Sequence, residues 1–510
     1  AEPGEARAMA EQDRGPEDAS MEEMEWEPGA EELDEEFRQG DCVEIDLGSD
    51  EDAPPESDDE AIDAANPNEE TGVIDENQIY ADDARPDVDD ALACVAHQES
   101  VLSVAVCPAD RRIILTGGQD DSAVLWGVEE TSTGIKMSER FRLTGHTDSV
   151  THVAFSHDGK YAATGSYDGT VRIWDPASGA LQHALEGPSK EVEWISWHPK
   201  GHAILAGSAD TMAWMWWAPT GKLMQIFAGH AQSVSCGCWG LGGKLVVTAS
   251  EDKSVIVWNP RTGTPQQHIR GVHEGGIVSI CAHPESPIVV TGSEDAGTKV
   301  VQIETGKVLH SLSGHEESVE ALGFSNPAAN GVLLLATGSM DSKVIVWDGK
   351  TFERRCVIKD QVEQGGVVRF KWLPQSAYGN WLCTCATDGA LRIFNALSGE
   401  CVRTLRGHSD TVLDVDVALG EAPAGGEGGQ QLLVVSGADD STCRLFVVAL
   451  WTSGNQGMAA ASQSSVPQPG APQAAAAAQL PPTPSSLEAG LGEGGVMLGR
   501  EQAFAPPPRA

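Results

Sequence analysis

Histidine, serine or threonine, and aspartate recur along this chain at spacings that could build a catalytic triad. The clearest example is the stretch from Gly145 to Asp175, GHTDSVTHVAFSHDGKYAATGSYDGTVRIWD, in which His146 precedes Asp168 and Trp174. A catalytic nucleophile needs one oriented base in one cleft. Here the same residue types return in unit after unit, so the pattern favours a structural role in each unit over a series of catalytic triads.

Short strands must position these residues. Val150 to Phe155 alternates apolar and polar residues, a turn with the sequence HDGK follows, and residues 161–166 and 170–174 continue the alternation around Asp168-Gly169. Alternation with a period of two, broken by Asp-Gly turns, predicts a meandering antiparallel sheet. Both faces of such a sheet need cover, so it requires copies of itself.

The copies are found by one spacing, an aspartate six residues before an aromatic residue. It occurs as Asp120/Trp126, Asp168/Trp174, Asp210/Trp216, Asp252/Trp258, Asp341/Trp347, Asp388/Phe394 and Asp440/Phe446, and in degenerate form as Asp295/Val301. An opening histidine repeats as His97, His146, His230, His273, His315 and His408. Pro188 takes its place in the third unit, and the seventh unit has none. The spacing predicts eight units within residues 91–448.

This pattern resembles the WD-repeat β-propeller family, whose repeats are about 40–45 residues long. The resemblance implies an all-β, eight-bladed propeller. It also implies that the histidine, a strand serine or threonine, the turn aspartate and the tryptophan form a hydrogen-bonded chain within each blade. Most units carry a strand just before their opening residue, so we expect residues 91–96 to complete the last blade and close the ring.

The two flanks differ from the repeats. Residues 1–90 contain 35 acidic residues, four arginines and no lysine, which accounts for −31 of the net charge of −44. Such a segment buries too little apolar surface to become ordered. We predict a disordered acidic arm, which is either a solubilising tail or a surface for basic partners, with the run DCVEIDL (41–47) as a weak docking motif. Residues 449–510, rich in Ala, Pro, Gln and Gly, are predicted to be a disordered tail.

The sequence lacks several marks of enzymes and membrane proteins. It contains no glycine-rich phosphate loop, no HExxH, no C-x-x-C and no apolar run of membrane-spanning length. Its eleven cysteines are scattered and suit a reducing compartment. We therefore expect a cytoplasmic protein, with the nucleus as a second location, that is monomeric and has no enzymatic activity, cofactor, metal or membrane span.

Function must then come from a surface. In the resembled family, the top face consists of the loops after each histidine and the residue before each turn aspartate. Acidic residues recur at these positions and at the start of the first strand, as Glu99, Asp148, Glu193, Glu251, Glu294, Glu317, Glu320, Asp410, Asp414 and Asp439, and only Arg369 is basic. We predict a focused negative patch, the alternative being ordinary polar loops on an acidic chain. Trp194 is predicted as a binding aromatic, with packing between blades as the alternative. The patch argues against nucleic acid as a partner.

The units and the acidic arm also resemble one subgroup, the angio-associated migratory cell protein family and its fungal counterpart. The fungal counterpart is a dedicated chaperone of a basic large-subunit ribosomal protein. The resemblance implies capture of a nascent ribosomal protein, whose Lys and Arg would pair with the acidic face. Three alternatives stay open: a histone chaperone, an adaptor linked to cell migration, and a receptor of a cullin ubiquitin ligase, for which WNPR (258–261) is the nearest motif.

Overall fold

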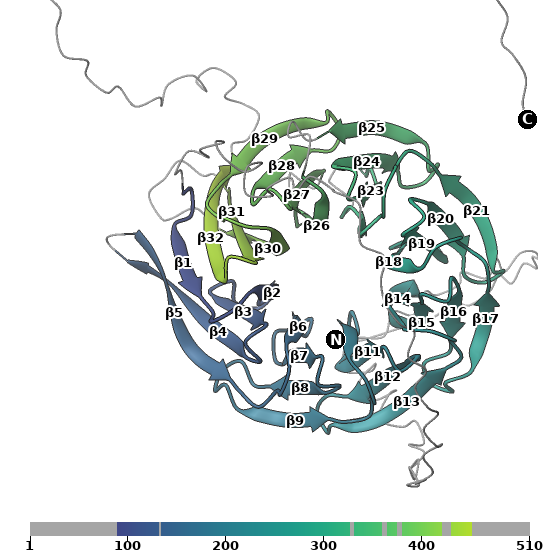
Figure 1. Cartoon of the computed structure of the whole chain (residues 1–510), viewed down its shortest axis with the longest axis horizontal. Helices are drawn as coiled ribbons and strands as arrows, with labels where there is room; N and C mark the ends of the chain where they lie inside the picture. Colours follow the sequence, from purple (N-terminus) through teal and green to yellow (C-terminus); the bar gives the residue numbers. More distant parts are fainter. Residues whose placement is uncertain are drawn as a thin grey trace, which may run out of the picture. The chain divides into compact units, whose positions relative to one another are not determined.

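Alternating apolar and polar residues form short antiparallel strands that aspartate-centred turns connect. The computed structural model describes residues 89–131, 134–326, 331–359, 365–374, 380–420 and 430–450. They form eight four-stranded antiparallel sheets that stand in a ring (Figure 1). The predicted all-β, eight-bladed propeller is confirmed.

We number the blades in chain order. Blades 1 to 4 comprise β2 (Val101–Val106), β3 (Ile113–Gly118), β4 (Ala123–Thr131) and β5 (Gly134–Leu143); β6 (Val150–Phe155), β7 (Ala162–Ser166), β8 (Val171–Trp174) and β9 (Leu181–Leu185); β10 (Val192–Trp197), β11 (Ala203–Ser208), β12 (Met212–Trp217) and β13 (Lys222–Ala228); and β14 (Cys236–Gly240), the 3₁₀ turn η2 (Leu241–Gly243), β15 (Leu245–Ala249), β16 (Val255–Trp258) and β17 (Pro265–Ile269). Blades 5 to 8 comprise β18 (Ile277–Ala282), β19 (Ile288–Ser293), β20 (Thr298–Gln302) and β21 (Lys307–Leu312); β22 (Ala321–Phe324), β23 (Leu334–Gly338), β24 (Lys343–Asp348) and β25 (Arg354–Lys359); β26 (Val367–Trp372), β27 (Trp381–Ala386), β28 (Leu391–Asn395) and β29 (Glu400–Leu405); and β30 (Val412–Gly420), β31 (Gln430–Ala438), β32 (Thr442–Leu450) and β1 (Ala93–Ala96).

The first described strand closes the ring. β1 pairs antiparallel with β32, with Ala93 opposite Leu445 and Ala96 opposite Thr442. It is therefore the outer strand of blade 8, beside three strands from the other end of the repeats (Figure 1). This pairing covers the edge of β32 over the paired residues, and an uncovered edge would invite association with other chains.

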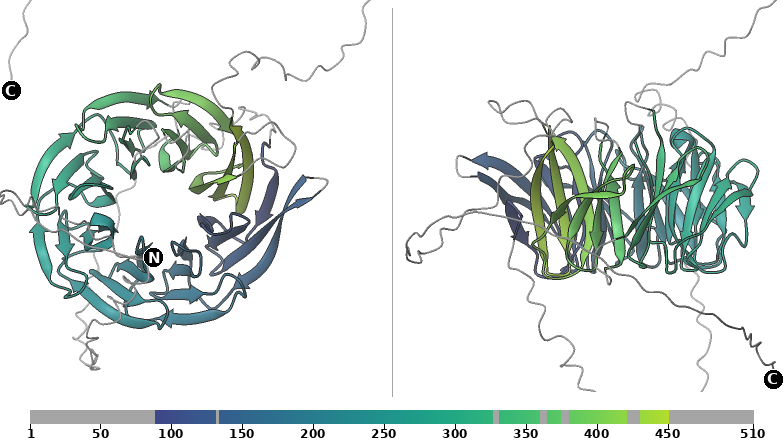
Figure 2. Two further views of the ribbon diagram at one scale, coloured as in Figure 1. Left: turned by 180° about the vertical axis from the view of Figure 1, so that it is seen from behind. Right: turned by 90° about the horizontal axis from the view of Figure 1, so that it is seen from above.

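The hydrophobic core lies between neighbouring blades. One cluster joins Leu115 and Leu125 of blade 1 to Val150 and Trp174 of blade 2. The view from behind shows the sheets arranged around the ring axis (Figure 2). The labelled first strands β2, β6, β14, β18, β26 and β30 lie innermost (Figure 1). The strand β7 is buried along its whole length, whereas most of the outer strand β9 is exposed. Each blade thus depends on both neighbours for burial.

The turn aspartate shapes the turn between the second and third strands in all eight blades. Its carboxylate accepts the backbone N–H two residues later, as from Thr170 to Asp168 at 2.9 Å. The residue between them has a positive φ, which suits the glycine at Gly169 and Gly389. In the other six blades a residue with a side chain takes this conformation: Asp121, Thr211, Lys253, Ala296, Ser342 and Ser441.

Two predicted segments lie outside the described residues. They are residues 1–88 of the predicted acidic arm and residues 451–510 of the predicted tail. The predictions for them remain predictions.

Candidate functional site

The repeated histidine, threonine, aspartate and tryptophan meet in one hydrogen-bonded chain. In blade 2, His146 Nδ1 lies 2.8 Å from Asp168 Oδ2, and His146 Nε2 lies 2.8 Å from Thr164 Oγ1. The Trp174 Nε1–H donates to the same hydroxyl at 3.0 Å. A carboxylate only accepts, so Nδ1 carries the proton and Thr164 donates its own proton to Nε2. The loop, the turn and two strands are thereby held in register.

Six blades share the histidine–aspartate contact, and four of them complete the chain with tryptophan. The other Nδ1 contacts are His97 to Asp120 at 3.1 Å, His230 to Asp252 at 3.1 Å, His273 to Asp295 at 3.2 Å, His315 to Asp341 at 3.1 Å and His408 to Asp440 at 2.9 Å. Tryptophan reaches the shared threonine in blades 1, 4 and 6 through Trp126, Trp258 and Trp347.

The protonation states in blade 2 suit a static network. Burial lowers the pKa of His146 below its ordinary value, although the neighbouring Asp168 opposes the shift. Burial alone would raise the pKa of Asp168, but hydrogen bonds from Thr170 and the proximity of His146 lower it to about 2. At neutral pH the pair is therefore a neutral imidazole donating to a carboxylate, and its hydrogen bonds are already satisfied within the blade.

Blade 3 replaces this chain with aromatic packing. Pro188 stands at the histidine position and Ala206 at the threonine position. The Trp214 Nε1–H donates to Asp210 at 3.3 Å in place of a histidine, and its ring stacks on Trp216 at a centroid distance of 6.2 Å. Trp216, at the repeated aromatic position, is buried.

Blade 7 uses an ion pair for the same purpose. The Arg392 guanidinium donates to both oxygens of Asp388, at 3.2 and 2.5 Å, and the arginine is only 4% exposed. Phe394 stands at the tryptophan position and is buried. Sequence reasoning identified Asp388 and Phe394 but missed Arg392. The available signal was an arginine four residues after the turn aspartate in a unit without an opening histidine, because Arg172 and Arg444, at the same position in units that have the histidine, contact Gly145 and Asp89 instead.

The loops before each first strand and after each second strand lie at one end of the sheets, which we call the top face. Seven predicted acidic residues are exposed there: Glu99, Asp148, Glu251, Glu294, Glu317, Asp410 and Asp439. Glu193 and Glu320 are half-buried, and Ser318 Oγ donates to Glu320 at 2.6 Å.

Blades 2, 3 and 4 carry Asp148, Glu193 and Glu251 of this set. Together with Glu191, an exposed residue that sequence reasoning missed, we call them the acidic cluster. Burial raises the pKa of Glu193, and the charges of Glu251 and Glu191 raise it further. Burial also raises the pKa of Tyr167, with contributions from Glu193, Glu191 and Asp148. The charges of Glu191 and Glu251 therefore repel that of Glu193, and a cation beside these three carboxylates would relieve the repulsion.

Tyr167 places an exposed aromatic ring beside the acidic cluster. Its side chain is 44% exposed, and it borders a surface hollow of about 400 Å³ that Glu191 and Lys190 also line. Sequence reasoning missed Tyr167, although it stands directly before a turn aspartate, a position that the same reasoning assigned to the top face. Met340 occupies the equivalent place in blade 6 and is 36% exposed.

Two predicted binding residues are buried. The prediction that Trp194 offers its ring to a partner is wrong: it is 6% exposed, and its Nε1–H donates to the Val234 carbonyl at 2.8 Å. Its indole fills a slot between blades 3 and 4 that exists because Gly207 and Gly237 carry no Cβ. Packing between blades, the alternative weighed above, is what the structure shows.

Asp414 is the second correction. It is 4% exposed, and its Oδ2 accepts the Ser103 Oγ–H and the Val104 N–H, both at 3.0 Å. These contacts join blade 8 to blade 1, so the carboxylate is already engaged within the ring. Arg369 approaches Asp414 to 4.0 Å from blade 7, which offsets part of its negative charge.

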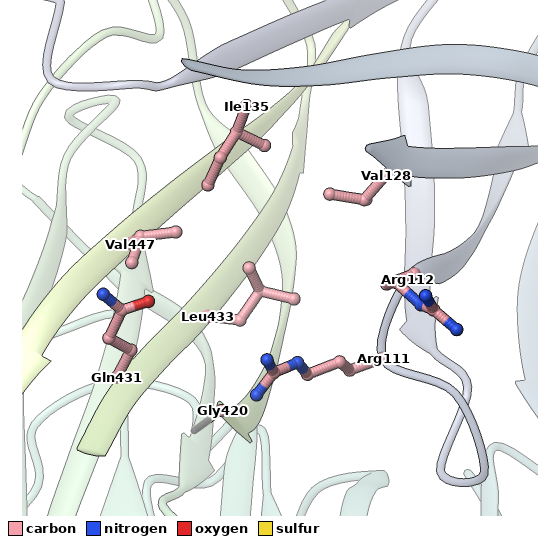
Figure 3. Close-up of a pocket in the computed structure, with 8 residues that line it drawn as sticks. All are labelled: Arg111, Arg112, Val128, Ile135, Gly420, Gln431, Leu433 and Val447. Carbon is pink, nitrogen blue, oxygen red and sulfur yellow. The ribbon is translucent and has the colours of Figure 1, made fainter. Parts of the chain in front are cut away.

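A cavity between blades 1 and 8 holds no space for a substrate. Figure 3 shows its lining: Arg111, Arg112, Val128, Ile135, Gly420, Gln431, Leu433 and Val447. Its volume is about 40 Å³, whereas ligand pockets typically measure about 300–1,000 Å³. We therefore place the candidate site on the top face.

Two cysteines are unsuited to act as nucleophiles at neutral pH. Burial raises the pKa of Cys238 and of Cys385 to about 12, so neither is a thiolate at neutral pH. Among the residues that the structure describes, no helix has the length and apolar character needed to cross a bilayer.

The repeats match those of a known protein family. A family described as "WD domain, G-beta repeat" matches residues 91–127, 137–175, 179–216, 221–259, 263–300, 306–348 and 399–446. The stretch between the last two matches contains β26 to β28 of blade 7, where Arg392 replaces the histidine. The chain is 29% identical to the angio-associated migratory cell protein of Homo sapiens over 400 residues, which cover 75% of this chain and 85% of that protein.

Solved structures share the fold. The chain is similar to Sqt1 of Saccharomyces cerevisiae, with a TM-score of 0.62 and 22% identity over 71% of this chain and 99% of that one. It is also similar to Sqt1 of Chaetomium thermophilum bound to the N-terminus of the ribosomal protein L10, with a TM-score of 0.59 and 24% identity over 71% of this chain and 100% of that one. At these identities the likeness concerns the fold alone.

Proposed function

Because this chain belongs to the family built from WD domain, G-beta repeats, we propose that it is a protein-binding propeller whose top face captures a basic ribosomal protein. In this proposal, the chain shields the positive charge of a nascent large-subunit ribosomal protein until assembly. The observation that carries it is the acidic cluster beside the exposed Tyr167. The solved propeller with the N-terminus of L10 makes a ribosomal N-terminal segment the first partner to test.

The recognition chemistry follows from the cluster. Lysine or arginine side chains of an extended segment would sit among Asp148, Glu191 and Glu251, where they relieve repulsion between carboxylates. The Tyr167 ring offers a face for a cation or for the stem of a long basic side chain. Each exposed ion pair contributes only about 0–1 kcal/mol. Several pairs on one segment add affinity and raise its association rate, and both effects weaken as salt screens them.

The test reverses charge on the cluster without disturbing the core. Glu191→Lys and Glu251→Lys are combined in the full chain, since both residues are exposed. The matched control combines Glu304→Lys and Glu353→Lys, two exposed acids in turns between third and fourth strands. Binding of a labelled Lys/Arg-rich ribosomal N-terminal peptide is measured by fluorescence anisotropy at low and at high salt.

We expect the cluster variant to bind at least about tenfold more weakly at low salt, which is about 1.4 kcal/mol, and the control to bind nearly as wild type. Equal losses in both variants would reduce the effect to net charge and reject a defined site. Pull-down from cell extract addresses the histone-chaperone alternative, because recovery of core histones in place of a ribosomal protein would overturn the proposed partner.

A further inference from the structure

Two histidines and an aspartate meet at the end of the sheets opposite the top face. His157 and Asp158 lie in the turn after β6 of blade 2, and His202 directly precedes β11 of blade 3. One potential ligand atom from each of the three residues lies within 4.8 Å of the others. Asp158 Oδ2 is 3.1 Å from His202 Nε2, and the two imidazole rings are 5.3 Å apart between centroids.

Neighbouring residues hold the side chains of Asp158 and His202 in place. Asp158 Oδ1 accepts the Ser156 Oγ–H at 2.8 Å and the Lys160 N–H at 3.1 Å, which leaves Oδ2 directed towards His202. The His202 ring is 7% exposed and meets the Tyr161 ring edge to face at 5.1 Å. Ligand groups that are already oriented lose little freedom when they bind an ion.

One nitrogen of this cluster has no hydrogen-bond partner among the described residues. His157 Nδ1 is buried and unpartnered, and leaving a buried polar atom unsatisfied is costly. The Lys160 ammonium contacts the same Asp158 Oδ2 as His202, at 2.9 Å, and the Lys160 side chain is 69% exposed.

From this geometry we propose that His157, Asp158 and His202 bind Zn²⁺. Two imidazoles and one carboxylate are ligands that zinc accepts, with a fourth position open to water or an external ligand. Tetrahedral zinc with bonds of about 2.0–2.1 Å places its ligand atoms about 3.3 Å apart. The contact of 3.1 Å between Asp158 and His202 is close to that spacing, and the ligand atom of His157 lies within 4.8 Å of both partners.

The proposed ion joins blade 2 to blade 3. Blade 3 lacks the histidine–threonine–tryptophan chain at its top, and the zinc would pin its opposite end to its neighbour. A ligand that binds the folded state but not the unfolded chain raises stability by an amount that grows with the logarithm of its concentration relative to its dissociation constant. Zinc should therefore raise the melting temperature of the protein, and this effect should depend on the three ligands.

The experiment uses the full chain, stripped with a chelator and titrated with ZnCl₂ against a chromophoric competitor. We expect His157→Gln and His202→Asn each to lose one high-affinity equivalent of zinc, or to bind it at least tenfold more weakly. The control His310→Gln changes an exposed histidine on β21 and should match wild type. Lys160→Gln should tighten binding severalfold, because it removes the ammonium that competes for Asp158.

Two results would overturn the site. The first is wild-type zinc affinity and stoichiometry in His157→Gln, a half-buried turn residue whose replacement should leave the ring folded. That outcome would assign the zinc to cysteines or to scattered acidic residues. The second is a wild-type melting temperature that does not rise with zinc, or that rises as much in both ligand variants as in wild type.

Discussion

Blades 2 and 3 are neighbours with the same strand order, yet they secure the same turn differently. Blade 2 uses the polar chain from His146 through Thr164 to Trp174. Blade 3 has no histidine or threonine at those positions and lets Trp214 donate to the turn aspartate while packing on Trp216. Blade 7 adds a third solution, the Arg392–Asp388 pair. Each of these blades therefore supplies hydrogen-bond donors to its turn aspartate and packs its interior with buried side chains. More than one set of residues can do both.

Removing the buried tryptophan that holds the turn in blade 3 should have the largest effect. Trp214→Ala should destabilise the protein by about 3–5 kcal/mol, because a large buried ring is lost and Asp210 loses a donor. Urea unfolding followed by circular dichroism measures this change. Trp26→Ala, in the acidic arm, serves as a control for the loss of one tryptophan. A cost below about 1 kcal/mol would show that blade 3 does not depend on Trp214.

The ion-pair solution in blade 7 gives the next test. Asp388→Ala should cost about 3–5 kcal/mol, because Arg392 would remain buried without its partner. The double variant Asp388→Ala with Arg392→Leu should recover most of the loss, since replacing both partners by apolar groups is often nearly neutral. If the double variant is as unstable as the single one, the contribution of Asp388 is its turn geometry and not the charge of Arg392.

The polar chain in blade 2 should be less costly to break. Asp168→Ala should cost about 1–3 kcal/mol, the penalty for leaving the neutral His146 and the Thr170 N–H without an acceptor. Binding of the basic peptide, measured on the folded variant, should change little. A variant that keeps wild-type stability but loses peptide binding would contradict the structural role of the turn aspartates.

The smallest expected effect concerns the backbone of the residue after the turn aspartate. Gly169 in blade 2 and Thr211 in blade 3 follow the turn aspartate with φ of 78° and 74°. A threonine pays a steric cost in this conformation that glycine avoids. Thr211→Gly should therefore stabilise the protein by about 0.5–1 kcal/mol, after the extra backbone entropy of glycine is subtracted. The converse change, Gly169→Ala, should destabilise it, and thermal unfolding of the two variants tests both signs.

The repeat architecture could be predicted from the sequence. The eight units follow from a local alternation and from one aspartate–aromatic spacing, which strand geometry translates directly into a sheet. The histidine–aspartate pairs also follow, because each joins residues of a single unit. The acidic residues of the top face were identified by position, but the pattern could not show which of them meet. Tyr167 was overlooked because only charge was considered at its position.

The repeat number and the order of strands within each blade could be predicted from the sequence, because both depend on residues within one unit. The polar chain was expected from the family resemblance, and among the described blades tryptophan completes it in four. The tertiary structure alone decided what happens between units. The Trp194 Nε1–H donates to the Val234 carbonyl 40 residues away, and Asp414 accepts the Val104 N–H 310 residues away. His202 likewise reaches Asp158 across 44 residues. Such contacts depend on which blades become neighbours and how closely glycines let them approach, and no pattern within one unit contains that information.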